Sequence, residues 1–427
     1  MSLLERIPDH RHPLLHTLAA GECDEGAFWE RAASLGTPLV EQDPSSPGHR
    51  LVTFLWRTNA TERWVVLHIV AGAPAANLLA RVYGTDVCHA TYRIRNDVRM
   101  AYAFAPDMPL HDWDGADATQ LQALNDYLAQ QPPGADPLHP ALERYRGEPG
   151  TPDLRFSILS LPDAPDESLV LKRDGIARGE LHRATFTSAI MGNERRLWIY
   201  TPPGYGETVT GAAKTDHPLL LAFDGGMYVS QVPAHRMLDN LFADGRIAPT
   251  VAVFVDNATP TSRNDELPCS EAFARCLETE LLPWVQANFR VTSNPARRFV
   301  TGFSYGGLAA MWMGHRLPHV FGNVIAQAPS LWWGPGHVIT EPRNEGRFRG
   351  EWLVDEFERS ARLPLRIWME IGLLEHPMLM LASNRRMRRV LEAKGYDLTY
   401  LEPAGGHEPA TWRGTLARAL AHMLPRS

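Results

Sequence analysis

Ser304 stands in a frame of glycines, in the sequence TGFSYGG of residues 301–307. Glycine loses more backbone entropy on folding than other residues, so a glycine cluster marks a backbone shape that other residues adopt poorly. The spacing Gly302-x-Ser304-x-Gly306 is typical of the sharp strand-to-helix turn that presents a nucleophilic serine at the end of a sheet. The alternative is an ordinary glycine-rich turn. Whether Ser304 lies between a strand and a helix distinguishes the two interpretations.

Strand-length apolar runs alternate with helical patterns from about Leu169 onward. The runs cover 218–224, 250–256, 298–303, 323–328, 365–372 and 398–403. Their hydrophobicity is continuous, which indicates parallel strands covered on both faces. A hairpin is predicted around Gly192, a helix after Ser270 that Pro283 should kink or end, and a helix that Gly395 terminates. The pattern predicts an α/β fold with Ser304 between a strand and a helix, which favours a nucleophilic role.

A nucleophilic serine needs a base that accepts its proton. In α/β-hydrolases the acid and then the histidine follow the serine in the chain, in loops after later strands. Of the 17 histidines, only His407 lies just beyond the last predicted strand, in a loop that two glycines make adaptable. His315 and His319 are too close to Ser304 in sequence to reach back to it. We therefore predict that His407 is the base.

The third member of such a triad is a carboxylate that orients the imidazole and stabilises its charged form. Glu375 follows the strand 365–372 and is our prediction. Glu370 is the alternative, although it lies inside the strand. Glu408 is adjacent to His407 and poorly placed to hold the far ring nitrogen. A surface carboxylate with no catalytic role is the other interpretation of Glu375.

Acyl transfer also needs backbone N–H groups that stabilise the oxyanion. One is expected from Tyr305, the residue after the nucleophile. The other is expected from the turn after the strand 218–224, where Gly225, Gly226 and Met227 follow one another. We predict Gly225, Gly226 and Tyr305 as the donors, the alternative being a plain turn after a strand.

The first part of the chain has a different pattern. Runs rich in β-branched and aromatic residues cover 49–57, 63–70, 78–97 and 98–106, which predicts a β-sandwich. Prolines and polar residues follow, in 124–140 and in 161–168, and indicate a domain boundary. We therefore expect an all-β sandwich domain over residues 1–165 and an α/β-hydrolase catalytic domain over residues 166–427.

Composition excludes several classes of protein. The 427 residues are 44% hydrophobic and carry a net charge of −7, which argues against a general nucleic-acid binder. No signal peptide or membrane span is expected, and four cysteines without a CxxC pair indicate reduced thiols in a cytoplasm. Cys269 and Cys276 could instead face each other or a metal. Histidines in 9–16 are expected in a solvated terminus, so we predict neither a metal nor a cofactor.

Longer motifs carry a family resemblance. In the catalytic half these are AFDGGMY (222–228), SRNDELPCSEAF (262–273) followed by ELLPW, TGFSYGGLAAMW (301–312), FGNVIAQAPSLWW (321–333), GLLEHPM (372–378) and GGHEPATWRGTL (405–416). In the N-terminal half they are RVYGTDVCHATYRI (81–94) and DPLHP (136–140). The chain resembles the enterochelin (enterobactin) esterases, which are esterase D-type α/β-hydrolases, over nearly its whole length.

The resemblance implies a reaction and its residues. The family cleaves the tri-serine lactone of catecholate siderophores inside the cell and so releases iron taken up as the ferric complex. By resemblance, Ser304 and His407 are catalytic and Glu375 is the matching acid. Gly226 and Met227 replace residues that are often bulkier in relatives, so the resemblance leaves the preferred siderophore open.

A ferric tris-catecholate is a trianion, so its site needs cations and aromatic faces. Arg263 matches the family's arginine and is predicted to contact substrate; the alternative is a structural pair with Asp265 or Glu266. Trp332 and Trp333 are predicted to form a stacking wall, with buried packing as the alternative. Four further arginines are expected on a solvated helix face: Arg385, Arg386, Arg388 and Arg389.

Two other functions stay open at this point. One is a cytoplasmic carboxylesterase for small acyl or phenolic esters, which would act on simple esters and not on trilactones. The other is a non-catalytic siderophore-binding protein. The intact set of serine, histidine and acid argues against the second alternative.

Overall fold

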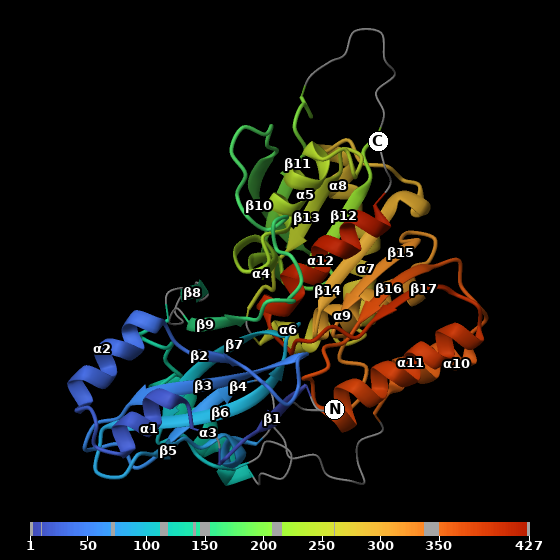
Figure 1. The fold of residues 1–427 in the computed structure, drawn as a ribbon. Coiled ribbons are helices and arrows are strands. Elements are labelled where there is room, and N and C mark those ends of the chain that lie inside the picture. Colours follow the sequence, from blue (N-terminus) through green and yellow to red (C-terminus); the bar gives the residue numbers. More distant parts are fainter. Residues whose placement is uncertain are drawn as a thin grey trace. The chain divides into compact units, whose positions relative to one another are not determined.

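The computed structural model describes residues 3–9, 11–69, 73–111, 118–139, 142–145, 154–206, 216–259, 261–336 and 350–424. These residues form two compact units, whose elements are labelled in Figure 1. The first unit holds the described residues up to Pro165 and the segment Ala404–Ala410. The second holds the described residues within 166–336, 350–403 and 411–424.

The first unit contains two antiparallel sheets. One has the order β1-β6-β3-β2, with β5 paired to β6, and the other has the order β4-β7-β9-β8. Their strands are β1 (Leu4–Arg6), β2 (Leu39–Gln42), β3 (His49–Arg57), β4 (Val65–Ile69), β5 (Ala80–Arg81), β6 (Val87–Arg95), β7 (Arg99–Pro106), β8 (Leu142–Tyr145) and β9 (Leu154–Ser160).

Aromatic side chains join these two sheets. The rings of Phe54 and Tyr102 lie 4.9 Å apart, and those of Trp56 and Phe104 lie 5.0 Å apart. Because β3 belongs to one sheet and β7 to the other, these contacts form the core of a sandwich. The predicted β-sandwich is thus confirmed, and the unit adds helices α1 (Pro13–Ala19), α2 (Glu25–Leu35) and α3 (Ala118–Gln130).

The proline-bearing stretch of residues 124–140 is not a linker. Its first part belongs to α3, and β8 and β9 follow it within the second sheet of the same unit. Local composition pointed to a boundary there because prolines and polar residues also occur in loops inside a domain. The division between the units falls between Pro165 and Asp166.

The second unit is built on an eight-stranded sheet with the order β10-β11-β13-β12-β14-β15-β16-β17. Its strands are β10 (Glu180–Ser188), β11 (Asn193–Thr201), β12 (Leu219–Phe223), β13 (Val251–Val255), β14 (Arg298–Phe303), β15 (Asn323–Gln327), β16 (Arg366–Glu370) and β17 (Asp397–Leu401). The hairpin β10–β11 around Gly192 pairs antiparallel with β13, and all later neighbours are parallel.

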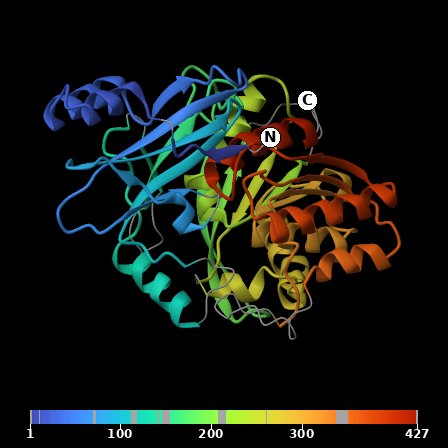
Figure 2. The same cartoon turned by 60° about the horizontal axis from the view of Figure 1, so that its bottom comes forward.

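Helices cover both faces of this sheet (Figure 2). They are α4 (Gly225–Ser230), α5 (Ala234–Ala243), α6 (Ser262–Glu266), α7 (Glu271–Cys276), α8 (Leu282–Asn288), α9 (Tyr305–Arg316), α10 (Trp352–Arg359), α11 (Ala382–Ala393) and α12 (Pro409–Met423). In β12, Leu219, Leu221 and Phe223 pack into the core with α7–α11, whereas Leu220 and Ala222 pack into the core with α4, α5 and α12. Burial on both faces explains the continuous apolar runs.

Pro283 does not end the helix that Ser270 caps. The chain continues from α7 through a wider π-helical turn, Leu277–Leu281, into α8, where Pro283 lies in the first turn. A proline is tolerated in a first turn because its missing N–H would lack an intrahelical acceptor there. The predicted stop at Gly395 is confirmed, since α11 ends at Ala393 and Gly395 has φ +69°.

The strand order places a topological switch at β12. Its sequence successor β13 lies on one side of it, and β14 lies on the other. Loops that leave the carboxyl ends of β12 and β14 therefore diverge, and such a point is where open α/β sheets bind their ligands. The predicted oxyanion turn follows β12 and Ser304 follows β14, so both lie at this switch.

Two glycines offer a matched test of this packing. A Cβ added at Gly302 would lie 2.2 Å from the backbone oxygen of Gly306, whereas one added at Gly414 in α12 has no neighbour within 4 Å. We expect Gly302→Ala to lower the midpoint of thermal unfolding strongly. Gly414→Ala should leave this midpoint unchanged or raise it, because alanine favours a helix interior. The expected gain in unfolding free energy is at most about 0.5–1 kcal/mol. Equal midpoints for both variants would contradict the close approach.

Candidate active site

Ser304 occupies a strained turn between β14 and α9. Its backbone has φ 56° and ψ −122°, a conformation that non-glycine residues rarely adopt and that is found at functional sites. The N–H of Ser304 donates to the backbone oxygen of Gln327 at the end of β15, at 3.0 Å. The serine is half-buried, and its Oγ lies 3.5 Å from Oγ of Ser330. This geometry matches the predicted turn for a nucleophile.

The glycines of the motif are needed because α9 packs directly on the strand it follows. A Cβ at Gly306 would lie 3.0 Å from Oδ2 of Asp224, and one at Gly307 would lie 2.9 Å from the backbone oxygen of Gln327. Real Cβ atoms tolerate neither approach without movement of the neighbour. The close approach brings the start of α9 against the ends of β12 and β15.

The turn after β12, like the Ser304 turn, places a positive-φ residue directly before a helix. Asp224 has φ 55° and ψ 47°, and α4 begins at the next residue, Gly225. Gly225 and Tyr305 are thus each the first residue of a helix, where an N–H has no acceptor inside the helix. The N–H of Gly226 instead donates to Oδ1 of Asp256, which follows β13. Gly226, one of the three predicted oxyanion donors, is therefore engaged by a carboxylate.

Arg263 pairs with Asp224, a partner that sequence reasoning missed. Its Nε and Nη2 donate to the two carboxylate oxygens of Asp224, each at 2.7 Å. The alternative of a pair with Asp265 or Glu266 is wrong, because Asp224 takes this place and Glu266 binds Arg195 in the core. A two-pronged bond of this kind fixes the guanidinium plane.

Asp256 is the second carboxylate that sequence reasoning missed. Besides the Gly226 N–H, it accepts Nε of Arg196 at 2.5 Å and the indole N–H of Trp198 at 3.3 Å. Asp224 and Asp256 each follow the last residue of a parallel strand. Polar residues at that position gather at the edge where these folds bind ligands, and this signal could have identified both.

The two alternative acids are bound elsewhere. Glu370, the last residue of β16, is fully buried and accepts hydrogen bonds from Gln327 Nε2 at 2.9 Å and Trp368 Nε1 at 3.0 Å, and it also contacts the Thr415 hydroxyl. Within the first unit, Glu408 accepts the backbone N–H of Ala101 at 2.7 Å. Glu370 therefore has both oxygens engaged, and one oxygen of Glu408 is engaged.

Glu375 and His407 lie in the loops that the chain order predicts. Glu375 follows β16, its N–H donates to the oxygen of Gly372 at 3.1 Å, and only 4% of the residue is exposed. A carboxylate buried to this degree does not fit the alternative of an ordinary surface residue. His407 lies between β17 and α12, on the segment Ala404–Ala410.

Trp332 and Trp333, which were predicted to form a stacking wall, have different neighbours. Trp332 lies beside Tyr305, with ring centres 6.1 Å apart, and the guanidinium of Arg263 lies 5.7 Å from the centre of the Tyr305 ring. Trp333 instead packs edge-on against Trp352 at the start of α10, at 6.3 Å. The structure thus brings Arg263, Tyr305 and Trp332 together next to Ser304, while Trp333 also contacts the neighbouring helix.

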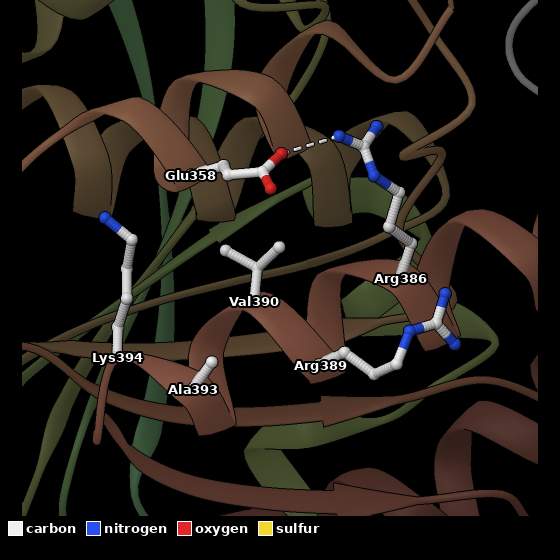
Figure 3. Close-up of a pocket in the computed structure, with 6 residues that line it drawn as sticks. All are labelled: Glu358, Arg386, Arg389, Val390, Ala393 and Lys394. Carbon is white, nitrogen blue, oxygen red and sulfur yellow. Dashed lines mark hydrogen bonds and ion pairs between the residues drawn. The ribbon is translucent and has the colours of Figure 1, made fainter.

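Three of the four arginines of α11 form ion pairs. Arg386 binds Glu351, Asp355 and Glu358, Arg385 binds Glu402, and Arg388 binds Glu392. Figure 3 shows the ion pair between Glu358 of α10 and Arg386 of α11. Both residues line a surface pocket of about 370 Å³, together with Arg389, Val390, Ala393 and Lys394. None of these residues belongs to the predicted site, so the pocket is separate from it.

Cysteine and metal chemistry find no support in the described part of the chain. All four cysteines are free, and burial raises the pKa of Cys269 and Cys276. No group of metal-binding side chains is present among the described residues. Within the same residues, the helices are too short or too polar to cross a bilayer.

Comparison with known proteins places this chain in a family. Residues 188–423 match the family described as "Putative esterase", and residues 51–170 match "Enterochelin esterase, N-terminal". An iron(III) enterobactin esterase of Dickeya dadantii is 30% identical, over 95% of this chain and 94% of the relative. The chain belongs to the enterochelin esterase family.

Solved structures agree with this assignment. An enterobactin esterase of Salmonella typhimurium has a TM-score of 0.73 at 27% identity, covering 93% of this chain and 98% of that one. The Shigella flexneri enterobactin esterase, crystallised in the presence of enterobactin, has a TM-score of 0.70 at 27% identity, covering 94% and 98%. By sequence comparison, an iron(III) salmochelin esterase of Escherichia coli is 25% identical to this chain over 97% of both chains. The fold of an N-terminal domain followed by an α/β-hydrolase domain is thereby confirmed.

The pair of Arg263 and Asp224 should stabilise the turn that precedes α4. Asp224 is almost fully buried, so Arg263→Ala leaves a charge without its partner and is expected to cost about 3 kcal/mol of unfolding free energy. Asp224→Asn in the same chain should recover part of that loss, because asparagine tolerates positive φ and carries no charge. Arg316→Ala, which breaks an exposed pair, should change stability by less than about 0.5 kcal/mol. Urea unfolding measures all three, and additive effects of the two site substitutions would contradict the pairing.

Glu370 should make stability depend on pH. Burial raises the pKa of its carboxyl above the ordinary 4.5, so the folded protein holds this proton more tightly than the unfolded chain does. Its contribution is complete below the unfolded pKa and is lost as pH rises toward the folded pKa. Glu370→Gln has no proton to lose, so the unfolding free energy of wild type minus that of the variant should be larger at about pH 5 than at about pH 8. A difference that does not change with pH would show that Glu370 titrates normally.

Proposed function

We propose that this chain hydrolyses the ester bonds of the tri-serine lactone in a catecholate siderophore such as enterobactin or its ferric complex, and so releases iron inside the cell. The observation that carries this proposal is Ser304 on a positive-φ turn at the topological switch, in a chain that matches enterobactin esterases over 95% of its length. Relatives named for enterobactin and for salmochelin both support a catecholate trilactone as the substrate class.

In the proposed mechanism, Ser304 is the nucleophile, His407 the base and Glu375 the acid that orients His407. His407 takes the hydroxyl proton as Oγ of Ser304 attacks the lactone carbonyl carbon, and the carbonyl oxygen becomes an oxyanion. Collapse of this intermediate breaks the bond to the alkoxy oxygen of the neighbouring serine unit, which receives the proton from His407. Water then cleaves the acyl-enzyme by the same route and restores Ser304.

The N–H groups of Gly225 and Tyr305 are the proposed oxyanion donors. Each begins a helix, α4 or α9, and each follows a positive-φ residue at the switch point. The positive ends of the two helix dipoles add to their effect on a developing negative charge. Gly226 is a weaker candidate, because its N–H would have to leave Asp256.

Arg263 and Trp332 are the proposed contacts for the anionic, aromatic substrate. Arg263 uses Nε and Nη2 on Asp224, so its Nη1 is the group proposed to bind a catecholate oxygen. Trp332, packed beside Tyr305, offers an aromatic face for a catechol ring. Contact with Trp333 stays a prediction.

The domain assignment accompanies this function. We propose a sandwich domain of residues 1–165 and a catalytic domain of residues 166–427. The proposed nucleophile, acid and oxyanion donors all lie in the second range, and residues 188–423 match the esterase family. A general carboxylesterase for simple esters remains the second candidate, because the turn that presents Ser304 is common to many esterases.

A chromatographic time course tests the proposal. Purified protein is incubated with enterobactin, with ferric enterobactin and with a neutral short-chain phenyl ester, and linear serine conjugates are separated from the trilactone. We expect both trilactone forms to be opened with higher kcat/KM than the simple ester. Turnover of the simple ester alone would favour the carboxylesterase, and binding without turnover of any of the three would favour a binding protein.

Substitutions test the assigned roles in the same assay. Ser304→Ala and His407→Ala should each lower kcat by about 10⁴-fold or more, because members of a triad act as a unit. Glu375→Ala should cost less, since it acts through His407. Ser293→Ala is the matched control, because it removes an exposed serine outside the proposed site and should keep full activity. Normal trilactone turnover by Ser304→Ala would exclude the mechanism.

A further inference from the structure

Gln327 contacts the Ser304 turn through its backbone and two helices through its side chain. Its backbone oxygen accepts the N–H of Ser304 at 3.0 Å. Its side chain points to the face of the sheet covered by α4, α5 and α12, where Oε1 accepts the hydroxyl of Tyr228 at 3.0 Å. The amide Nε2 lies 2.9 Å from the oxygen of Trp412 and 2.8 Å from Oγ1 of Thr415. One residue thus touches the nucleophile turn, α4 and α12.

Glu370 holds Gln327 from the neighbouring strand. The two residues are register partners in β15 and β16, and Gln327 Nε2 lies 2.9 Å from Glu370 Oε1. The same oxygen contacts the hydroxyl of Thr415, while Oε2 accepts the indole N–H of Trp368 at 3.0 Å. The carboxyl is 1% exposed and accepts hydrogen bonds from Gln327, Trp368 and Thr415, so the cluster is held by buried hydrogen bonds.

Phe303 adds an aromatic layer to this cluster. It immediately precedes Ser304, and its ring stacks on Trp412 at 4.2 Å with an angle of 9° between the planes. On another side it contacts the ring of Tyr228 at 5.1 Å. The residue before the nucleophile is therefore placed by one ring from α4 and one from α12.

These contacts join the elements that carry the proposed chemistry. Tyr228 lies in α4, whose first residue is the proposed oxyanion donor Gly225, and Trp412 lies in the first turns of α12, which begins two residues after His407. Rigid support of this kind is what reacting groups need, because small misplacements cost large factors in rate.

We propose that Gln327 and Glu370 are positioning residues of the proposed hydrolysis, which hold the Ser304 turn, α4 and α12 in one arrangement. The inference rests on the proposed function but concerns residues that do not contact substrate. A packing role alone would predict lost stability and unchanged turnover. A positioning role predicts lost turnover beyond the loss of stability.

Gln327→Leu is the main test, because it keeps the approximate size and removes every side-chain hydrogen bond. Asp239→Leu is its matched control: Asp239 is a buried residue of α5 that accepts the hydroxyl of Tyr200 and the N–H of Gly179, each at 2.8 Å, away from the Ser304 turn. Both variants should lower the unfolding midpoint. Only Gln327→Leu should lower kcat, by about 10- to 100-fold with KM changed less than about threefold.

A conservative pair tests the second residue. Glu370→Gln has one carbonyl oxygen in place of two carboxylate oxygens, so it can keep either the bonds to Gln327 and Thr415 or the bond to Trp368, and it should lower kcat less than Glu370→Leu does. Glu370→Leu loses all of these bonds and should behave like Gln327→Leu. If Gln327→Leu does not fold, Tyr228→Phe and Thr415→Val each remove one hydroxyl of the cluster and should lower kcat by about 3- to 10-fold.

The outcomes separate this inference from the proposed function. All rates are measured with the trilactone or, if it is not a substrate, with the phenyl ester, and with Ser304→Ala as the blank. An active wild type, an inactive Ser304→Ala and a selective fall in kcat for Gln327→Leu support positioning. The same wild type and blank with normal kcat in Gln327→Leu, or with an equal fall in Asp239→Leu, would overturn it while leaving the hydrolase intact. An active Ser304→Ala would overturn the proposed function itself.

Discussion

The close packing of α9 on β14 is the constraint on which the rest of the second unit depends. A Cβ at Gly302 would meet the backbone of Gly306, and a Cβ at Gly306 would meet the carboxylate of Asp224, so neither position has room for one without movement of its neighbours. This close packing forces the chain through positive φ at Ser304 and starts α9 at once. The strain of such a residue, of order 1–3 kcal/mol, persists only where the surroundings hold it. The backbone bond from Ser304 to Gln327 and the stack of Phe303 on Trp412 supply that support.

Two carboxylates, Asp224 and Asp256, lie at the carboxyl ends of β12 and β13. Asp224 and Asp256 follow adjacent parallel strands, and each has an arginine partner, Arg263 or Arg196. Unpaired, two buried carboxylates would repel an anionic substrate and each other. Paired, they neutralise the edge and orient the first turn of α4, with Asp256 holding the N–H of Gly226. The edge therefore combines neutralised carboxylates with fixed N–H groups, an arrangement that avoids repulsion of an anionic ester.

A cluster of buried polar side chains also lies in the second unit. Gln327, Glu370 and Thr415 satisfy one another where an isolated charge would be costly. Replacing such a cluster by apolar residues can leave a protein folded, so its presence is better explained by placement than by stability. The Trp412 ring stacks on Phe303 and its backbone oxygen accepts the Gln327 amide, so both contacts connect the strand ends beside Ser304 to the start of α12.

The sequence by itself determined the α/β architecture of the second unit and the position of Ser304 in a turn between a strand and a helix. Continuous apolar runs predict buried parallel strands, and Gly302-x-Ser304-x-Gly306 predicts the turn, because both are local patterns that follow from burial and from backbone sterics. Only the tertiary structure decided which polar side chains bind each other. Arg263 binds Asp224 rather than its sequence neighbours, and Gln327 meets Glu370, because β12, β13, β14, β15 and β16 become neighbours only in the folded sheet. Strand order arises from contacts between residues far apart in the chain, and a local pattern does not encode it.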